Sequence, residues 1–450
     1  MGRAFGAATL RAALESLGAA APDARYCVAL SGGADSTALL NCLVELRRQE
    51  PAFALRAIHV NHHLQSAAGS WAEHCAALGR QLSVPLLVLD AQVRQAPGES
   101  PEAAARDARY GLLAEHLSPG EFLLTAHHAE DQLETFLLQL ARGAGVAGLA
   151  SMPRHAPLGQ GIHLRPLLEF SRDALRDYLT AVGLGWIDDP SNAELRFDRN
   201  YLRQRVLPIL LQRWPSLAAS SVRSAEHLAS AQRVLDEVAK ADYAPAAEGR
   251  RLQAAVLRGL EPARLHNALR YWIRQQAATL PPSATLEEIA EQMFGARDDA
   301  IPQVTWGDYA VRRYRDRLYL DRRLPAAPSE TLLWRWRAEP ELTLPAGLGT
   351  LRARAAGRKT ATFRRLPEEL RVNWRSGGER LRVAVNRPHR ELRALLQEWD
   401  ILPWMRAYIP LLYAADTLVA VGDLAIAAEF RAAPDEPGTL IEWLDHPALD

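Results

Sequence analysis

The sequence predicts an α/β protein with a doubly wound parallel sheet, followed by a helical domain and a small α+β domain. In the first part of the chain, short apolar runs alternate with helical patterns, which is typical of a parallel sheet with helices on both faces. One apolar run breaks into Ser-Gly-Gly-Ala-Asp-Ser at residues 31–36 and restarts as an apolar helix. Such a loop lies at the carboxyl end of its strand, where ligands bind in sheets of this kind.

The predicted elements follow one another in strand–helix order. Strands are expected at residues 26–30, 55–60, 85–89 and 122–126, where apolar residues run together. Helices are expected at residues 36–48, 67–82, 101–117 and 130–142, where apolar residues recur at i, i+3 and i+4. Every parallel pair of strands can therefore be joined by a helix.

The chain of 450 residues is too long for one core, and three domains are expected. The first covers residues 1–215. Residues 216–324 carry apolar helical faces and predict a mainly helical domain. Residues 330–450 carry short strand-like runs and predict a mixed domain, after a Leu-Pro-Ala-Ala-Pro linker at residues 324–328.

Composition narrows the class of protein. Hydrophobic residues make up 48% of the chain, charged residues 24%, and the net charge is zero, as in an ordinary soluble globular protein. The three cysteines form no Cys-x-x-Cys pair, which argues against a zinc site, an iron–sulfur cluster or a disulfide framework. No apolar leader or membrane span is visible, so a cytoplasmic protein with no membrane partner is expected.

The loop at residues 31–36 has the chemistry of a pyrophosphate site. Its glycines let backbone N–H groups turn toward an anion, and the next helix directs its positive end there. Ser31, Ser36 and Thr37 add hydroxyl donors. Asp35 would repel phosphate, so we expect it to hold a Mg²⁺ ion that bridges phosphate oxygens.

A second polar cluster, residues 127–135, follows the strand at 122–126 and falls on the same sheet edge. His127 and Asp131 are four residues apart and would share a face if both lay on a helix. The cluster fits a metal or catalytic site, and it equally fits acidic residues that complement a helix dipole. The strand end near His59 could line an adenine pocket, although such a histidine is commonly only part of a solvated turn.

Two arginine-rich stretches also allow two interpretations. In residues 188–205, Arg199 or Arg203 could stabilise charge that develops on a phosphate or a carbonyl oxygen, or the stretch could be a salt-bridged helix. Residues 352–393 are strongly basic with aromatic residues nearby, which fits either an anion-binding face or a solvated face.

Residues 31–36 match, without departure, the Ser-Gly-Gly-x-Asp-Ser loop of the PP-loop N-type ATP pyrophosphatases. Within that group the chain resembles the tRNA(Ile)-lysidine synthetase family over nearly its whole length. The motifs that carry this resemblance are Arg106-x-x-Arg109-Tyr110, His127-His128-x-x-Asp131-Gln132-x-Glu134-Thr135, Arg142-Gly143-x-Gly145-x-x-Gly148-Leu149, Asp189-Pro190-Ser191-Asn192, Arg199-Asn200-Tyr201-Leu202-Arg203 and Gly377-Gly378-Glu379-Arg380.

The resemblance implies a sheet of the adenine-nucleotide α-hydrolase type and a set of site residues. Residues 386–393 have arginine where a lysine-rich run would be usual, which keeps the charge but changes the geometry of phosphate contacts. The implied sites are ATP contacts from Ala29, Ser31, Gly32, Gly33, Ala34, Asp35, Ser36 and His59; Mg²⁺ ligands Asp35 and Asp131; catalytic residues Asp35, Asp131, Arg199 and Arg203; and tRNA contacts from Arg106, Arg109, Arg380, Arg387 and Arg390.

The function that the resemblance implies is ligation of free lysine to the first anticodon cytidine of an isoleucine tRNA with a CAU anticodon. ATP would be split to AMP and pyrophosphate through an adenylated cytidine, and codon reading would change from AUG to AUA. The first domain would be catalytic, the second would recognise substrate, and the third would bind tRNA. The oligomeric state is left open, and a homodimer is one of the states allowed. The alternatives are a PP-loop enzyme that thiolates a tRNA base and a non-catalytic RNA-binding protein.

Overall fold

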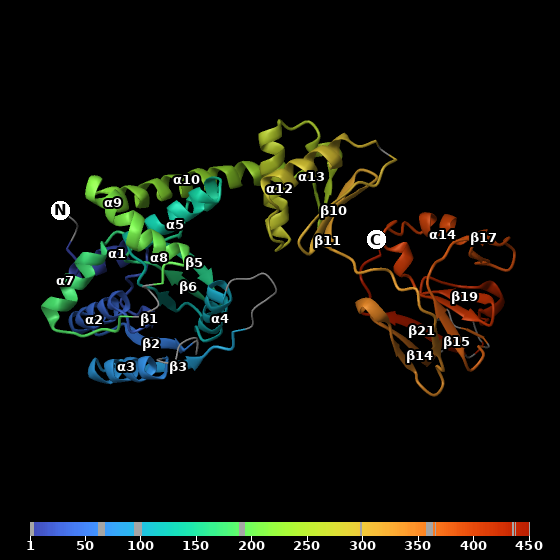
Figure 1. Ribbon diagram of the computed structural model, residues 1–450. Helices are drawn as coiled ribbons and strands as arrows, with labels where there is room; N and C mark the ends of the chain where they lie inside the picture. The colour runs from blue at the N-terminus through green and yellow to red at the C-terminus, as the bar shows by residue number, and fades with distance from the viewer. Residues whose placement is uncertain are drawn as a thin grey trace. The chain divides into compact units, whose positions relative to one another are not determined.

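The computed structural model describes residues 4–61, 68–93, 101–188, 194–297, 299–356, 363–364, 366–433, 436 and 438–449 (Figure 1). By packing, the chain divides into two compact units, residues 1–235 and 236–450, and the division falls within one helix, α10 (Leu217–Tyr243). The three-domain division proposed above therefore stays a prediction. None of the helices in the described part of the chain is long and apolar enough to cross a membrane.

The first unit contains a six-stranded sheet in the order β3-β2-β1-β4-β6-β5. Its neighbouring strands pair in parallel, except β5 and β6, which form an antiparallel pair at one edge. The strands are β1 (Arg25–Ala29), β2 (Ala54–Asn61), β3 (Leu86–Asp90), β4 (Phe122–Leu124), β5 (His155–Leu158) and β6 (Gly161–Leu164), and the helices are α1 (Ala7–Ser16), α2 (Ala34–Gln49), α3 (Ala68–Gln81), α4 (Pro101–Glu115), α5 (Ala129–Ala141), α6 (Val146–Leu149), α7 (Arg172–Val182), α8 (Asp198–Tyr201) and α9 (Leu207–Arg213).

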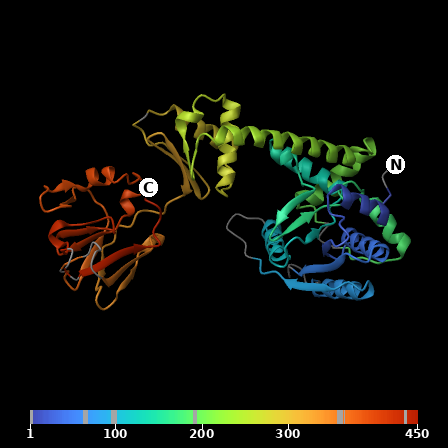
Figure 2. The ribbon, with the colours of Figure 1, turned by 180° about the vertical axis from the view of Figure 1, so that it is seen from behind.

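Both faces of this sheet are covered, because successive residues of its strands enter different cores. In β1, Tyr26 and Val28 pack with helices α1, α2, α3 and α7, whereas Cys27 packs on the opposite face with Leu113 and Leu117, in and just after α4. Figures 1 and 2 show α2 and α4 on opposite sides of the sheet. The doubly wound sheet expected from the sequence is confirmed.

The strand order reverses between β1 and β4, and this point positions the site. From β1 the chain moves outward through β2 to β3, and then returns to place β4 on the other side of β1. The loops that follow β1 and β4 therefore leave neighbouring strands at the same edge of the sheet, where ligands bind in such folds. These loops carry the two polar clusters that the sequence singles out.

The segment from α8 to α9 contains a π-helical turn, η2 (Leu202–Val206). Turns of this kind have one extra residue per hydrogen-bonded loop and are frequent at functional sites. Just after it, Leu207 is buried and packs with Leu133 of α5 and Val222 of α10. The segment is therefore anchored to the helix that follows β4.

At the opposite edge of the sheet, Arg56 of β2 and Glu121 before β4 form an ion pair. Arg56 Nε and Nη2 lie 2.6 and 2.7 Å from the two carboxylate oxygens of Glu121, which is 4% exposed. Although burial would raise the pKa of Glu121, the Arg56 guanidinium and the Ser118 N–H hold that pKa below its ordinary value of 4.5. The pair therefore stabilises the fold at neutral pH.

We expect Glu121→Gln to lower the free energy of unfolding by about 2 kcal/mol at pH 7, because it leaves Arg56 without its carboxylate. A carboxylate with a lowered pKa stabilises the fold above its unfolded pKa, and that contribution is lost as the pH falls through the folded pKa. The difference between variant and wild type should therefore shrink below pH 4.5. Urea unfolding at pH 7 and pH 3.5 measures this difference in unfolding free energy. The control is Glu15→Gln, which breaks the exposed ion pair with Arg11. An equal difference at both pH values would contradict the stabilising role of the Glu121 carboxylate.

The second unit begins with a part that is not purely helical. Besides α10, α11 (Ala254–Leu257), α12 (Pro262–Gln275) and α13 (Ser283–Gly295), it contains a five-stranded antiparallel sheet, β7-β8-β11-β10-β9, which the sequence analysis did not foresee. Two arginines of β10, Arg312 and Arg313, are buried, and Arg313 donates to the carbonyl oxygens of Met293 and Ala296 near the end of α13. Because charged residues occupy buried positions of β10, its sequence lacks the alternation of polar and apolar residues that identifies a strand. The strands are β7 (Ala247–Glu248), β8 (Arg251–Gln253), β9 (Gln303–Trp306), β10 (Tyr309–Tyr314) and β11 (Arg317–Arg322).

The rest of the second unit is the small α+β part that the sequence predicts. Its strands form the antiparallel sheets β12-β15-β18-β19-β20, β13-β14-β21 and β16-β17 around a common core. The expected linker at residues 324–328 has no regular structure. The elements are β12 (Leu332–Trp334), β13 (Glu341–Thr343), β14 (Thr350–Ala356), β15 (Leu370–Asn373), β16 (Arg380–Leu381), β17 (Arg390–Glu391), α14 (Leu392–Glu398), β18 (Leu411–Ala414), β19 (Thr417–Val421), β20 (Ala425–Ile426) and β21 (Gly438–Leu444).

Candidate active site

A cavity of about 770 Å³ opens in the first unit, at the edge of the sheet where the loops after β1 and β4 meet. Its wall includes most of the site residues predicted from the sequence. Those that line it are Ala29, Ser31, Gly33, Ala34, Asp35, Ser36, His59, Arg106, Arg109, Asp131, Arg199 and Arg203.

The loop after β1 is held by hydrogen bonds between its own residues. The hydroxyls of Ser31 and Ser36 lie 3.0 Å apart, and the Ser36 hydroxyl also donates to the Gly33 carbonyl oxygen at 3.1 Å. Gly33 caps the N-terminus of α2 without a side-chain hydrogen bond. The first N–H groups of that helix are therefore free to meet an anion, as the sequence predicts.

Gly32 and Thr37 are not among the residues that line this cavity. Gly32 has a φ of +85°, and a Cβ built there would lie 3.0 Å from Cys75 Sγ. The Gly32 carbonyl accepts a hydrogen bond of 2.9 Å from Ile187 N–H. Gly32 therefore shapes the turn through its left-handed backbone and its close packing against Cys75. The Thr37 side chain is fully buried, and its hydroxyl has no hydrogen-bond partner among the described residues, so its role as a phosphate donor stays a prediction.

We expect Gly32→Ala to lower the free energy of unfolding by about 2 kcal/mol and to weaken ATP binding about tenfold. The left-handed backbone and the contact with Cys75 both oppose a methyl group here. Gly18→Ala is the matched control, because Gly18 has a φ of +67° but nothing within 4 Å of a built Cβ. Urea unfolding and ATP titration measure both effects. Equal losses in the two variants would show that contact with Cys75 contributes nothing.

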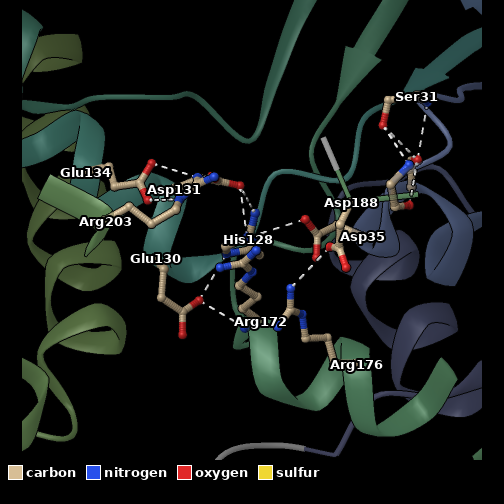
Figure 3. A network of polar contacts seen from close by, with 12 residues as sticks. Ser31, Asp35, His128, Glu130, Asp131, Glu134, Arg172, Arg176, Asp188 and Arg203 are labelled. Atoms are coloured by element: carbon tan, nitrogen blue, oxygen red, sulfur yellow. Dashed lines mark hydrogen bonds and ion pairs between the residues drawn. The ribbon is translucent and has the colours of Figure 1, made fainter. Parts of the chain in front are cut away.

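His128 lies at the centre of the polar network in Figure 3, with Asp35 on one side and Asp131 and Glu130 on the other. Its Nε2 is 3.7 Å from Asp35 and 3.4 Å from Asp131, and its Nδ1 is 3.0 Å from Glu130. Burial alone would lower the pKa of His128, but these three carboxylates raise it to about 9. The imidazole is therefore positively charged at neutral pH and holds the two predicted metal ligands together.

The predicted relation between His127 and Asp131 is corrected by the structure. Helix α5 begins at Ala129, so His127 precedes it and shares no helical face with Asp131. Instead the Asp131 carboxylate accepts the backbone N–H of His128 at 3.1 Å. Burial would raise the pKa of Asp131, yet the charges of His128 and Arg203 help to lower that pKa to about 2.

Glu134 organises the two arginines that the sequence proposes for catalysis. It is fully buried, and its carboxylate oxygens lie 2.7 Å from Arg203 Nε and 2.9 Å from Arg203 Nη2. Arg203 Nη2 also donates to Asp131 at 2.8 Å. Arg199 Nε lies 3.5 Å from Glu134, and its Nη2 donates to Thr135 at 3.0 Å. One carboxylate thus positions both guanidinium groups against the cavity. Figure 3 shows Arg203 beside Glu134 and Asp131.

The donor set at Asp35 fits a divalent cation. Asp35 Oδ1 is buried and accepts no hydrogen bond from the residues that the structure describes. A buried carboxylate oxygen without a partner is costly, and a bound cation would satisfy it. Within the described part of the chain, no group of three or more acidic, histidine or cysteine side chains forms a complete metal cage. A pair of carboxylates agrees with Mg²⁺, which keeps waters and takes phosphate oxygens as further ligands.

His59 forms part of the cavity wall beside the loop. Its ring Nδ1 lies 2.8 Å from the Leu30 carbonyl oxygen, which can only accept, so Nδ1 carries the hydrogen. Burial lowers the pKa of His59, and the ring is neutral. His59 therefore lies where a contact with a bound nucleotide could form, and the predicted contact stays a proposal.

The remaining predicted residues divide between the two units. Arg106 and Arg109 line the cavity of the first unit rather than an open surface. In the second unit Arg380 and Arg387 are exposed, while Arg390 is paired with Glu398 at 2.6 Å. The Asp-Pro-Ser-Asn motif at 189–192, the histidines at 62 and 63, and the basic residues at 358, 359 and 365 lie outside the described residues.

Sequence reasoning missed the roles of His128, Glu130 and Glu134, although all three belong to the second polar cluster. Glu134 is three residues after Asp131 on α5, so both can face the same arginine. The spacing of three residues between Asp131 and Glu134 was the signal from which the role of Glu134 could have been predicted.

Known proteins resemble this chain along most of its length. Family models match residues 7–210 (PP-loop domain), 252–319 (TilS substrate binding domain) and 370–443 (TilS substrate C-terminal domain). A tRNA(Ile)-lysidine synthase of Methylococcus capsulatus is 41% identical over 429 residues, covering 94% of this chain and 97% of the relative. That of Alkalilimnicola ehrlichii is 43% identical, covering 92% of each chain, and that of Coxiella burnetii is 40% identical, covering 93% of each. The chain therefore belongs to the tRNA(Ile)-lysidine synthase family, as its motifs indicate.

Proposed function

We propose that this chain uses ATP to join free lysine to C2 of the first anticodon cytidine of an isoleucine tRNA with a CAU anticodon. The observation that carries the proposal is the convergence of the loop at 31–36, the carboxylates of Asp35 and Asp131, and Arg203 on one cavity. The names of its relatives support the choice of tRNA and product. A tRNA substrate also agrees with the expected cytoplasmic location.

In the first proposed step, the C2 oxygen of cytidine attacks the α-phosphorus of ATP, and pyrophosphate leaves. The N-terminus of α2 and the hydroxyls of Ser31 and Ser36 suit the departing pyrophosphate. Arg203 and Arg199 suit the charge that develops on the phosphate oxygens. Asp35 and Asp131 would hold Mg²⁺, which when bound supplies further neutralisation of phosphate charge.

In the second proposed step, the neutral ε-amine of lysine attacks C2, a C–N bond forms, AMP leaves with the former carbonyl oxygen, and one proton is released. Asp131 has a pKa of about 2, which makes it a poor base. The proposal therefore assigns metal binding and orientation of the amine to Asp131, and does not assign removal of the proton to it.

The test is transfer of labelled lysine to RNA in the presence of ATP and Mg²⁺. Isoleucine tRNA with a CAU anticodon should become labelled at the first anticodon position, as located by RNA mass spectrometry, and AMP should form in equal amount. The matched control is the same tRNA with U at that position, which lacks the cytidine. Formation of AMP without labelled RNA would overturn lysine as the second substrate.

The cysteines of this chain do not support the alternative function, thiolation of a tRNA base. Cys27, Cys42 and Cys75 are free and buried, and burial raises the pKa of each, for Cys27 and Cys75 to about 12. A nucleophilic or sulfur-carrying cysteine needs the opposite, an exposed thiolate.

A further inference from the structure

A small pocket of about 180 Å³ lies in the second unit, where the hairpin of β10 and β11 meets the end of α14. This volume admits a single planar ring system. Its wall combines aromatic rings, on which a base can stack, with guanidinium groups, which attract phosphate. The wall includes Tyr314, Tyr319 and Trp399, together with Arg251, Arg315 and Asp400.

Trp404 packs against the two tyrosines of the pocket without lining the pocket itself. The centre of its ring lies 5.2 Å from that of Tyr319 and 6.4 Å from that of Tyr314, and both pairs are edge-to-face. Arg312, which is 4% exposed, places its guanidinium carbon 5.3 Å from the centre of the Trp404 ring. These contacts hold the two tyrosine rings in place, so the pocket is formed before any ligand enters it.

Two residues of the wall have a strained backbone. Arg315 has a φ of +53° and Asp400 a φ of +59°, in the left-handed region that residues other than glycine rarely adopt. Arg315 Nη1 lies 2.7 Å from Asp400 Oδ1, and this ion pair joins the hairpin to the end of α14. Strain of this kind is concentrated at ligand sites, where the surrounding structure maintains it.

Positive charge gathers beside the pocket at Arg406. Its Nη2 is buried and has no hydrogen-bond partner among the described residues. Burial lowers the pKa of Arg406, and the charges of Arg375 and Arg393 lower it further, whereas Tyr314 of the pocket wall raises it. Arg375 lies 3.9 Å from Glu379, but in the described part of the chain no carboxylate forms an ion pair with Arg393 or Arg406. A buried guanidinium N–H without an acceptor is costly, and a phosphate oxygen would satisfy it.

We infer that this pocket binds the base of one unpaired nucleotide of the tRNA, while Arg393 and Arg406 bind its phosphate. This inference rests on the proposed function. Aromatic rings stack on any base, but the base must be unpaired, because a paired base is already stacked within its own helix. Guanidinium groups bind phosphate oxygens through charge-assisted hydrogen bonds.

The unpaired 3′ end of the tRNA is the part that we assign to the pocket. A tRNA exposes unpaired nucleotides in its anticodon loop and at its 3′ end. Under the proposed function, the anticodon supplies the cytidine that reacts at the cavity of the first unit, so the 3′ end is the single strand that remains. Arg380 and Arg387 are exposed and lie outside the pocket wall, and they suit the backbone of a paired region.

The test compares the binding of intact tRNA with that of the same tRNA trimmed of its unpaired 3′ nucleotides. The wild-type protein should bind the intact tRNA about tenfold more tightly. Trp399→Leu removes one ring of the wall and should abolish this preference, while its affinity for trimmed tRNA stays that of the wild type. Arg393→Gln, at an exposed position of α14, should reduce the preference about threefold.

The matched controls lie elsewhere in the same unit. Trp336 is half-buried against the same core as Trp399, and Arg337 is exposed. Trp336→Leu and Arg337→Gln should keep the full preference for intact tRNA. Urea unfolding shows whether Trp399→Leu is as stable as Trp336→Leu, and Arg393→Gln tests the site independently of that result.

Equal binding of intact and trimmed tRNA by the wild type would overturn the inference, and so would an equal loss of affinity for both RNAs in Trp399→Leu or Arg393→Gln. Transfer of labelled lysine to the intact tRNA is measured alongside. If no lysine is transferred, the proposed function fails. If lysine is transferred and the two RNAs bind alike, only the nucleotide pocket fails.

Discussion

Asp35→Asn is expected to reduce pyrophosphate release from ATP, measured with tRNA present, by about 10³-fold or more. The amide keeps the shape of the side chain but removes the charge from Oδ1, a buried carboxylate oxygen that has no hydrogen-bond partner among the described residues. The free energy of unfolding should stay within about 1 kcal/mol of wild type, because the removal of a buried charge offsets the loss of the ion pair between Asp35 and His128.

The control for this variant is Asp177→Asn, on the exposed face of α7. It removes the same charge from the same unit of the protein and should leave pyrophosphate release unchanged. If Asp35→Asn consumed ATP at the wild-type rate, the loop would have no role in ATP cleavage. The non-catalytic RNA-binding alternative would then become the better interpretation.

Glu134→Gln is expected to have the second large effect, on both activity and stability. The change leaves the half-buried guanidinium of Arg203 without its bidentate partner, and such a loss costs about 3 kcal/mol of unfolding free energy. Because Arg199 and Arg203 also lose their fixed positions, lysine transfer should fall at least about 10²-fold. Urea unfolding and single-turnover transfer of labelled lysine measure the two effects.

Two variants separate positioning from charge balance. Glu134→Asp keeps the negative charge on a shorter side chain, so it should recover most of the stability but little of the activity. Glu169→Gln breaks an ion pair with Arg154 at the surface and should cost less than about 1 kcal/mol with full activity. If Glu134→Gln were as stable as wild type, Glu134 would not be the anchor of the two arginines.

The sequence predicts this fold well where the signals are local. The run that ends in Ser31-Gly32-Gly33 shows a strand, a turn and a helix within a few residues, and the structure confirms all three. Asp35 and Asp131 are far apart in the chain, yet their meeting was predictable, because both follow neighbouring strands of one parallel sheet.

The rest depends on packing that no local pattern reveals. His128 gains its charge only when Asp35, Glu130 and Asp131 surround it, and each acid taken alone looks like an ordinary helix residue. The proximity of Gly32 to Cys75 depends on how α3 packs behind the loop. Arg313 is fully buried against the end of α13, so a strand that contains it does not show the usual polar and apolar alternation.

A π-helical turn spans Leu202–Val206. In this turn, the number of residues matters more for the geometry of the site than the identity of most side chains. Each residue of a helix turns the chain by about 100°. Arg203 must face Glu134 while Leu207, four residues later, packs on Leu133. Removing or adding one residue between them would turn one of these contacts away from its partner. Substitutions at exposed positions such as Gln204 and Arg205 should be tolerated, whereas single-residue insertions and deletions in this turn should be eliminated by selection.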